Sequence, residues 1–140
     1  MPDRDFRVRP LEILVVDDDK TFGESLALFL SGDERLVVTE IASDLGAALD
    51  STSGRHFDLA LVDVHLDTQS GFQVVEALHA QHPDLPTLMM SGLDKSEIEA
   101  RARACGARGV LEKTDLARRG QEAVLDAYLA GQLGIAEQAR

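Results

Sequence analysis

Short apolar segments alternate with longer amphipathic segments along this chain. The short ones are rich in Val, Ile, Leu and Met and lack a helical period, which is typical of strands buried on both faces. We expect such strands at residues 12–16, 36–41, 59–62, 87–90 and 109–111. Regular alternation of strands and helices with short connections predicts a series of βαβ units and a parallel sheet.

The longer segments carry the spacing and the end signals of helices. The first, near residues 20–30, places Phe22, Leu26, Phe29 and Leu30 on one face. Four more helices are expected. The second begins at a Ser43 or Asp44 cap and runs to about residue 50, and the third runs from about 71 to 79. The fourth runs from a capping box of Asp94 and Glu97 to Gly106, and the fifth runs from an Asp115 cap to about 130.

Five such units in 140 residues favour one α/β domain. Right-handed crossovers place helices on both faces of the sheet, which favours a doubly wound, flavodoxin-like (βα)5 three-layer sandwich with the parallel strand order 2-1-3-4-5. The ligand crevice of that fold opens between the first and third strands. We expect the domain to span residues 11–130, between an N-terminal tail at 1–10 and a C-terminal tail at 131–140.

Composition excludes several classes of function. The 14 Lys and Arg against 25 Asp and Glu give a net charge of −11, which disfavours direct nucleic-acid binding. The one cysteine, Cys105, cannot form an internal disulfide. No apolar run is long enough for a membrane span, and the charged N-terminal residues lead us to expect no signal sequence. We therefore expect a cytoplasmic protein that binds neither nucleic acid nor a membrane directly.

Carboxylates follow the first and third predicted strands. Asp17, Asp18 and Asp19 come directly after the first strand, and Asp63 comes after the third. If these strands are parallel neighbours, the acids meet at one sheet edge and repel each other unless solvent, a proton or a hard cation such as Mg²⁺ offsets their charge. Helix capping accounts for one or two of the acids, and turn formation accounts for Asp63, but neither accounts for the whole cluster.

A serine and a lysine follow two further strands at the same edge. Ser91 ends the fourth strand and Lys113 ends the fifth. Alone, each has an ordinary interpretation, as a turn residue and as a surface lysine. Together with the acids they supply what phosphoryl transfer to a carboxylate needs: a metal ion and an ammonium that neutralise the phosphoryl oxygens, a hydroxyl donor, and a carboxylate nucleophile.

This arrangement resembles the receiver domain of two-component response regulators over about residues 11–129. The resemblance implies that Asp63 is the phosphoacceptor and that Ser91 and Lys113 contact the phosphoryl group. It also implies a Mg²⁺ (or Mn²⁺) ion held by Asp17, Asp18, Asp63 and the backbone carbonyl of His65. The chain would not be an enzyme with a separate substrate, but would catalyse its own phosphorylation and slow dephosphorylation.

The resemblance also implies partners. A histidine kinase or a histidine phosphotransfer protein would donate the phosphoryl group from a phosphohistidine, and phosphorylation would shift an equilibrium between two conformations. The altered surface would be that of helix 4, strand 5 and helix 5. Basic side chains outnumber acidic ones between residues 101 and 119, so we expect an acidic downstream protein there. We expect a single-domain receiver, although a domain of a longer protein fits the sequence equally.

Several positions bear on switching and hydrolysis. Thr114 follows Lys113 where receivers usually have a proline, and Val110 stands where they usually have a strand-5 aromatic residue that moves on phosphorylation. His65 and Leu93 stand beside the path of the hydrolytic water in this family, where bulk slows loss of the phosphoryl group. These departures leave the coupling through an aromatic residue open, while the phosphorylation chemistry is unaffected.

Two alternatives stay open at this point. One is a pseudo-receiver, a binding module that works without phosphorylation, for which Thr114 and Val110 leave room. The other is a phosphatase of the haloacid-dehalogenase type, which also uses a strand-end Asp with Mg²⁺. Such enzymes carry a second Asp two residues after the nucleophile, where this chain has His65, and a cap domain for which the chain has no room.

Overall fold

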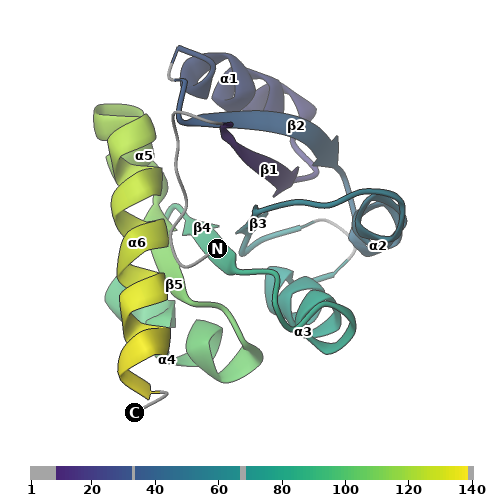
Figure 1. The fold of residues 1–140 in the computed structure, drawn as a ribbon, viewed down its shortest axis with the longest axis vertical. Helices are drawn as coiled ribbons and strands as arrows, with labels where there is room; N and C mark the ends of the chain where they lie inside the picture. Colours follow the sequence, from purple (N-terminus) through teal and green to yellow (C-terminus); the bar gives the residue numbers. More distant parts are fainter. Residues whose placement is uncertain (1–8, 33, 67–68, 139–140) are drawn as a thin grey trace.

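A five-stranded parallel sheet forms the centre of the molecule (Figure 1). The computed structural model describes residues 9–32, 34–66 and 69–138. The strands lie in the predicted order, β2-β1-β3-β4-β5. They comprise β1 (Leu11–Val16), β2 (Leu36–Ala42), β3 (Leu59–Asp63), β4 (Thr87–Ser91) and β5 (Gly109–Glu112). Every predicted strand is present, and its ends agree with the prediction to within one residue.

Helices cover both faces of the sheet. They are α1 (Lys20–Leu30), α2 (Leu45–Gly54), α3 (Gly71–Gln81), α4 (Lys95–Cys105), α5 (Lys113–Arg119) and α6 (Gln121–Gln138). Helices α2, α3 and α4 pack on one face, and α1, α5 and α6 pack on the other (Figure 1). This is the three-layer sandwich that right-handed crossovers produce.

Each central strand supplies side chains to both cores. Along β1, Leu14 and Val16 belong to the core beneath α2, α3 and α4, whereas Ile13 and Val15 belong to the core beneath α1, α5 and α6. All four side chains are fully buried. Because successive side chains of a strand point to opposite faces, a sheet covered on both sides needs a continuous apolar run. That requirement explains the unbroken apolar segments in the sequence.

The helix ends follow local capping signals, with two differences from the prediction. Asp44, not Ser43, caps α2. At α4 the Asp94 carboxylate accepts a hydrogen bond from the N–H of Ser96 rather than from that of Glu97, so the capping box predicted there is wrong. A capping box is present instead at the start of α3. Helices α2 and α3 each extend a few residues beyond their predicted ends.

The last helical segment also differs from the prediction. We predicted one helix from an Asp115 cap, whereas α5 begins earlier, at Lys113, and a break at Gly120 separates it from α6. Asp115 lies in the first turn of α5, where two arginine side chains bind its carboxylate. Gly120 has a φ of +56°, and a Cβ at this position would lie 3.1 Å from the ring of Phe29. Glycine fits both the left-handed backbone and this close approach of α1.

The C-terminal helix is longer than predicted. Helix α6 runs to Gln138, so residues 131–138, which we assigned to a tail, continue the helix. Residues 1–8 of the predicted N-terminal tail lie outside the described residues, and the domain limits of 11 and 130 stay a prediction. Within the described residues, no helix combines the length and the apolar character needed to cross a membrane.

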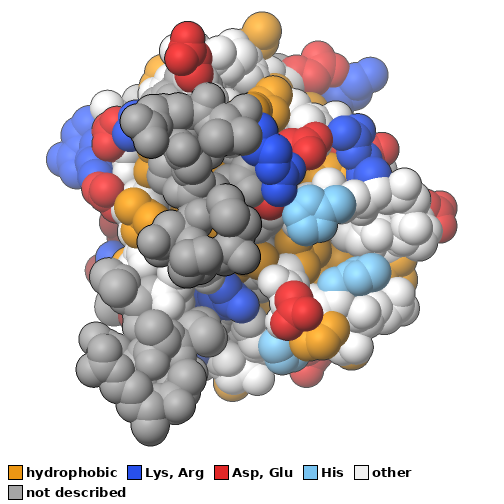
Figure 2. All heavy atoms as spheres, in the orientation of Figure 1, with side chains coloured by type: hydrophobic (Ala, Val, Ile, Leu, Met, Phe, Trp, Pro, Cys, Tyr) orange, Lys and Arg blue, Asp and Glu red, His pale blue; other side chains and the backbone are white. Residues whose placement is uncertain are grey.

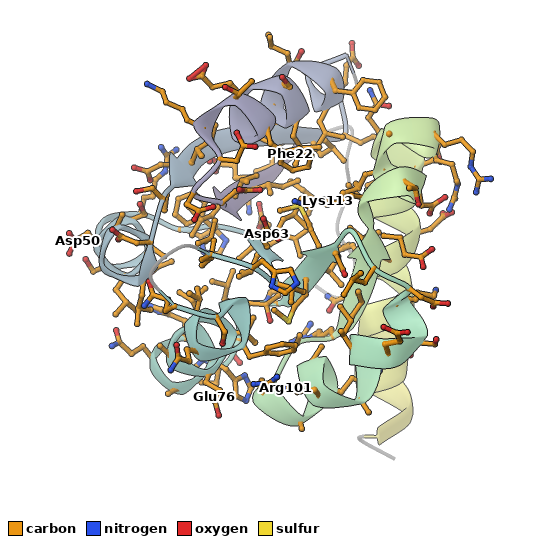
Figure 3. All side chains as sticks on the ribbon, turned by 180° about the vertical axis from the view of Figure 1, so that it is seen from behind. Phe22, Asp50, Asp63, Glu76, Arg101 and Lys113 are labelled. Atoms are coloured by element: carbon orange, nitrogen blue, oxygen red, sulfur yellow. The ribbon has the colours of Figure 1, made fainter. Side chains whose placement is uncertain are left out.

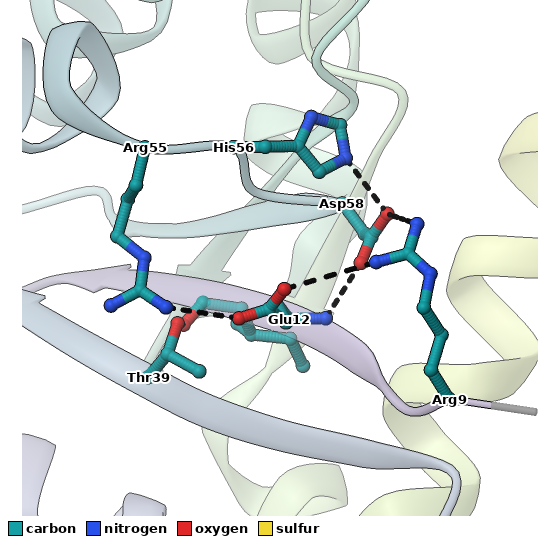
Figure 4. A network of polar contacts seen from close by, with 7 residues as sticks. Arg9, Glu12, Thr39, Arg55, His56 and Asp58 are labelled. Atoms are coloured by element: carbon teal, nitrogen blue, oxygen red, sulfur yellow. Dashed lines mark hydrogen bonds and ion pairs between the residues drawn. The ribbon is translucent and has the colours of Figure 1, made fainter.

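A network of charged side chains joins the N-terminal ends of β1 and β3 (Figure 4). The carboxylate of Asp58 accepts a hydrogen bond of 2.8 Å from the backbone N–H of Glu12, and it lies 3.1 Å from Nε2 of His56. The carboxylate of Glu12 accepts one of 3.0 Å from Arg55, and Arg9 lies 3.8 Å from both acids. These contacts tie the segment before β3 to β1.

Histidines gather at the same end of the molecule. His56 and His82 line a hollow of about 330 Å³, and Figure 2 shows histidine side chains close together on this face. Among the described residues, three potential metal ligands come together in one place, and all three are carboxylates at the opposite end of the sheet. The histidines therefore do not contribute to that cluster.

Candidate functional site

Three carboxylates meet at the C-terminal ends of β1 and β3. Asp17 and Asp18 follow β1, and Asp63 ends β3, which is the neighbour of β1 in the sheet. One oxygen of each side chain lies within 4.8 Å of the others. Asp17 is 1% exposed and Asp63 is 6% exposed, whereas Asp18 is partly buried. The fold therefore brings together the acids that follow two different strands, in a place where solvent screens them poorly.

Asp17 is almost fully buried, and only one of its oxygens is satisfied. Oδ1 accepts a hydrogen bond of 2.8 Å from the backbone N–H of Asp19, but the buried Oδ2 has no hydrogen-bond partner among the described residues. Burial, together with the nearby charge of Asp63, raises the pKa of Asp17 to about 6, although the hydrogen bond from Asp19 acts to lower it. A buried oxygen that accepts no hydrogen bond, beside two further carboxylates, fits a hard divalent cation such as Mg²⁺.

Asp63 accepts hydrogen bonds on both of its oxygens. Oδ1 accepts one of 3.2 Å from the backbone N–H of His65, and Oδ2 accepts one of 3.1 Å from Nζ of Lys113. The same Nζ lies 3.9 Å from Oδ2 of Asp17. Lys113 opens α5, and Figure 3 shows its side chain directed toward Asp63. One ammonium thus contacts two carboxylates of a cluster of three, which leaves negative charge for a cation to neutralise.

Ser91 lies at the same edge, at the end of β4. Strands β3 and β4 pair so that Asp63 lies opposite Met90, the residue next to Ser91. Ser91 is 1% exposed, and its Oγ accepts a hydrogen bond of 2.9 Å from the N–H of Leu93. Because a hydroxyl can accept and donate at the same time, this bond leaves the proton of Ser91 available for a phosphoryl oxygen.

The remaining predicted residues lie on the elements around this edge. His65 has an exposed imidazole and pairs with Ser70 across the loop that follows β3. Leu93 is 52% exposed, and Val110 is buried in the core beneath α4. Thr114 is exposed in the first turn of α5, and the described residues contain no cis peptide bond. The roles of these residues in metal binding, switching and hydrolysis stay predictions.

The sequence analysis did not predict the close contacts that two residues make at the site. Gly71 opens α3 so close to β3 that a Cβ would lie 1.9 Å from the backbone oxygen of Asp63. Phe22, in the first turn of α1, faces the ammonium of Lys113, with 4.3 Å between Nζ and the ring centroid. Helical spacing assigned Phe22 to the core-facing side of its helix, and no local signal connects that residue with one on α5.

Several cationic side chains of residues 101–119 already have partners within this protein. Arg119 binds both Asp115 and Asp126. Arg101, on α4, lies over an aromatic ring of α3, 4.1 Å from its centroid. An acidic protein that docked here would have to compete with such contacts, and its binding stays a prediction.

Comparison with known proteins identifies the family. The response regulator receiver domain family matches residues 13–124, which include most of β1, all of β2 to β5 and the carboxylate cluster. Among curated proteins, the chain is 34% identical over 113 residues to protein-glutamate methylesterase/protein-glutamine glutaminase 5 of Anaeromyxobacter dehalogenans. That match covers 79% of this chain and 31% of the relative. The chain therefore spans about a third of the length of this relative.

Solved structures agree with that match. The signal receiver domain of the putative response regulator NarL from Mycobacterium tuberculosis has a TM-score of 0.75 and 29% identity, and the match covers 86% of this chain and 97% of that one. A response regulator from Burkholderia pseudomallei with a phosphorylated aspartic acid, a calcium ion and citrate has a TM-score of 0.73 and 26% identity, over 91% of this chain and 72% of that one. This chain thus belongs to the response regulator receiver domain family of two-component signal transduction.

Proposed function

We propose that the chain accepts a phosphoryl group on Asp63 in a reaction that requires Mg²⁺ (or Mn²⁺). The donor would be a phosphohistidine of a histidine kinase or of a histidine phosphotransfer protein. The observation that carries the proposal is the convergence on Asp63 of one ammonium and two further carboxylates from separate parts of the chain. The phosphorylated aspartic acid and the calcium ion of the related Burkholderia pseudomallei structure support the same chemistry.

The transfer follows from the groups around Asp63. One carboxylate oxygen attacks phosphorus, the phosphorus–nitrogen bond of the phosphohistidine breaks, and the imidazole leaves with the electron pair and takes a proton from solvent. The product is an acyl phosphate on Asp63. Lys113 and the proton of Ser91 stabilise charge on the phosphoryl oxygens during transfer. Asp17 and Asp18 would hold the cation, which when bound neutralises further charge on those oxygens.

Helix α5 gives the phosphoryl site a direct route to the rest of the molecule. Lys113 is both the ammonium that binds Asp63 and the first residue of α5, so no loop separates the site from the helix. When the phosphoryl group gives the ammonium a new partner, the start of α5 must adjust with it. We expect the signal to reach the surface of α4, β5 and α5 in this way. The buried Val110 on β5 has no ring that could move between two positions.

The experiment that tests the proposal uses the whole chain with acetyl phosphate and Mg²⁺. Intact-mass spectrometry should detect one added phosphoryl group on the wild type and none on Asp63→Asn. Asp50→Asn is the matched control, because Asp50 is an exposed carboxylate on α2, away from the cluster (Figure 3). This variant should be phosphorylated as the wild type is, and chelation of the metal should abolish the reaction in both.

The two alternatives make different predictions. A pseudo-receiver would form no adduct on Asp63, even with a cognate kinase and Mg²⁺, and that result would overturn the proposal. The family match assigns the chain to receivers rather than to phosphatases of the haloacid-dehalogenase type. The position two residues after Asp63 is occupied by the exposed His65 instead of the acid that such enzymes use.

A further inference from the structure

The ammonium of Lys113 has an aromatic neighbour in addition to its two carboxylates. Nζ lies 3.1 Å from Oδ2 of Asp63, 3.9 Å from Oδ2 of Asp17 and 4.3 Å from the centroid of the Phe22 ring. Figure 3 shows Phe22 and Asp63 on either side of this lysine. The π face of an aromatic ring carries partial negative charge, so it attracts an ammonium that is partly removed from water.

Phe22 is held in place by its own helix. Its backbone N–H donates a hydrogen bond of 3.0 Å to the carboxylate of Asp19, the N-cap of α1. Its ring is partly buried and packs against the core beneath α1, α5 and α6. The ring position therefore follows from the start of α1, directly after the acids at the end of β1.

A groove between α1 and α5 borders the lysine. Phe22, Phe29 and Leu116 line this groove of about 340 Å³ together with Lys113, and Phe22 is the lining residue whose ring faces the ammonium. An apolar neighbour of this kind covers the methylene groups of a lysine while its ammonium reaches a polar site. The Lys113 side chain is 28% exposed, so without a ring at its side the ammonium has access to solvent and to other rotamers.

We propose that Phe22 is a positioning residue for phosphoryl transfer, because its ring holds the ammonium of Lys113 at the phosphoacceptor Asp63. This inference rests on the proposed function. A charged group that is already in position at the reacting atoms lowers the barrier to phosphoryl transfer, because the protein does not have to move that group when charge develops. Phe22 itself touches neither the phosphoryl group nor Asp63 in this mechanism, and it acts only through Lys113.

The kinetic test compares two leucine substitutions in one groove. Phe22→Leu removes the ring and keeps an apolar side chain, whereas Phe29→Leu makes the same change where no contact with the Lys113 ammonium exists among the described residues. With acetyl phosphate and Mg²⁺, Phe22→Leu should lower the saturating rate about three- to thirtyfold, as expected for loss of one partly desolvated cation–ring contact. The half-saturating concentration of acetyl phosphate should hardly change, and Phe29→Leu should react as the wild type does.

Two further variants separate positioning from a general structural effect. Phe22→Tyr keeps the ring and should restore most of the rate. In a Lys113→Met background, Phe22→Leu should have little further effect, because the two residues act as one unit. The inference is overturned if the tyrosine variant reacts as slowly as the leucine variant, or if Phe22→Leu slows the Lys113→Met protein by the same factor as the wild type.

A spectroscopic measurement needs no phosphorylation. Ring currents of Phe22 should shift the Hε protons of Lys113 upfield in the wild type, and this shift should disappear in Phe22→Leu and persist in Phe29→Leu. Its absence from the wild type would refute the inference even where Asp63 is phosphorylated normally. Absence of any adduct on wild-type Asp63, with the shift present, would instead refute the proposed function.

Discussion

Lys113 and Asp63 form a hydrogen bond of 3.1 Å between side chains that are 50 positions apart in the sequence. The lysine opens α5, and the aspartate ends β3. Asp17 and Asp18 bring two further carboxylates to the same place, and one ammonium cannot neutralise three negative charges. The cluster therefore costs stability in the unloaded protein, which fits the proposed binding of a cation and a phosphoryl group at this place.

Lys113→Met should destabilise the metal-free protein. The substitution keeps most of the aliphatic volume and removes the only charge that offsets the repulsion between Asp63 and Asp17 within the described residues. Because the pair is partly exposed, we expect a loss of about 1–2 kcal/mol in the free energy of unfolding, measured by urea denaturation in EDTA. Lys20→Met removes an exposed ion pair with Glu24 and should cost less than about 0.5 kcal/mol. Equal stability of the two variants would contradict the prediction.

The buried Asp17 should make stability fall with rising pH. Its pKa is about 6 in the folded protein and has an ordinary value of 3.8, so the folded state keeps a proton that the unfolded chain has already released. Below about pH 4 both states are protonated at this group, and the protein is most stable. As the pH rises from about 4 to about 6, the free energy of unfolding falls by about 3 kcal/mol. In EDTA at pH 7, Asp17→Asn should therefore be more stable than the wild type. The advantage should shrink toward pH 4 in urea titrations, and a difference that does not depend on pH would contradict the assignment.

Magnesium should stabilise the folded protein through the acidic cluster. A ligand that binds only the folded state adds about 2.7 kcal/mol at one hundred times its dissociation constant. Thermal unfolding followed across a magnesium titration should show this increase in the wild type and little of it in Asp18→Asn. Asp19→Asn is the matched control, because Asp19 caps α1 and asparagine caps equally well. If Asp19→Asn lost the magnesium response as completely as Asp18→Asn, the cluster would be wrongly assigned.

Gly71→Ala should be strongly destabilising. An added Cβ would lie 1.9 Å from the backbone oxygen of Asp63, so β3 and the start of α3 would have to move apart. We expect a loss of more than about 3 kcal/mol, at the upper end of overpacking effects. Gly54→Ala, at a helix position with nothing within 4 Å of the new Cβ, should change stability by less than about 1 kcal/mol. Chemical denaturation of the two variants tests this difference, and near-wild-type stability of Gly71→Ala would rule out the tight contact.

Much of the candidate site could be predicted because it follows from one rule of parallel sheets. The carboxyl ends of neighbouring strands share an edge, so residues that directly follow β1, β3, β4 and β5 have to approach each other once the strand order is known. This rule predicts the meeting of Asp17 with Asp63 and of Asp63 with Lys113. It says nothing of which oxygen lacks a partner, and the unsatisfied Oδ2 of Asp17 emerges only from the packing.

The sequence alone determined the order of the elements, the burial of the sheet on both faces and the residue types at its functional edge. It could do so because the spacing of apolar residues in strands and helices, and the residues at strand ends, are local properties of the chain. Only the tertiary structure decided the contact of Phe22 with Lys113, the approach of Phe29 to Gly120 that accompanies the break between α5 and α6, and the contact that excludes a Cβ at Gly71. Each of these depends on how closely two elements approach. That distance is set by the packing of many side chains at once, and no single stretch of sequence encodes it.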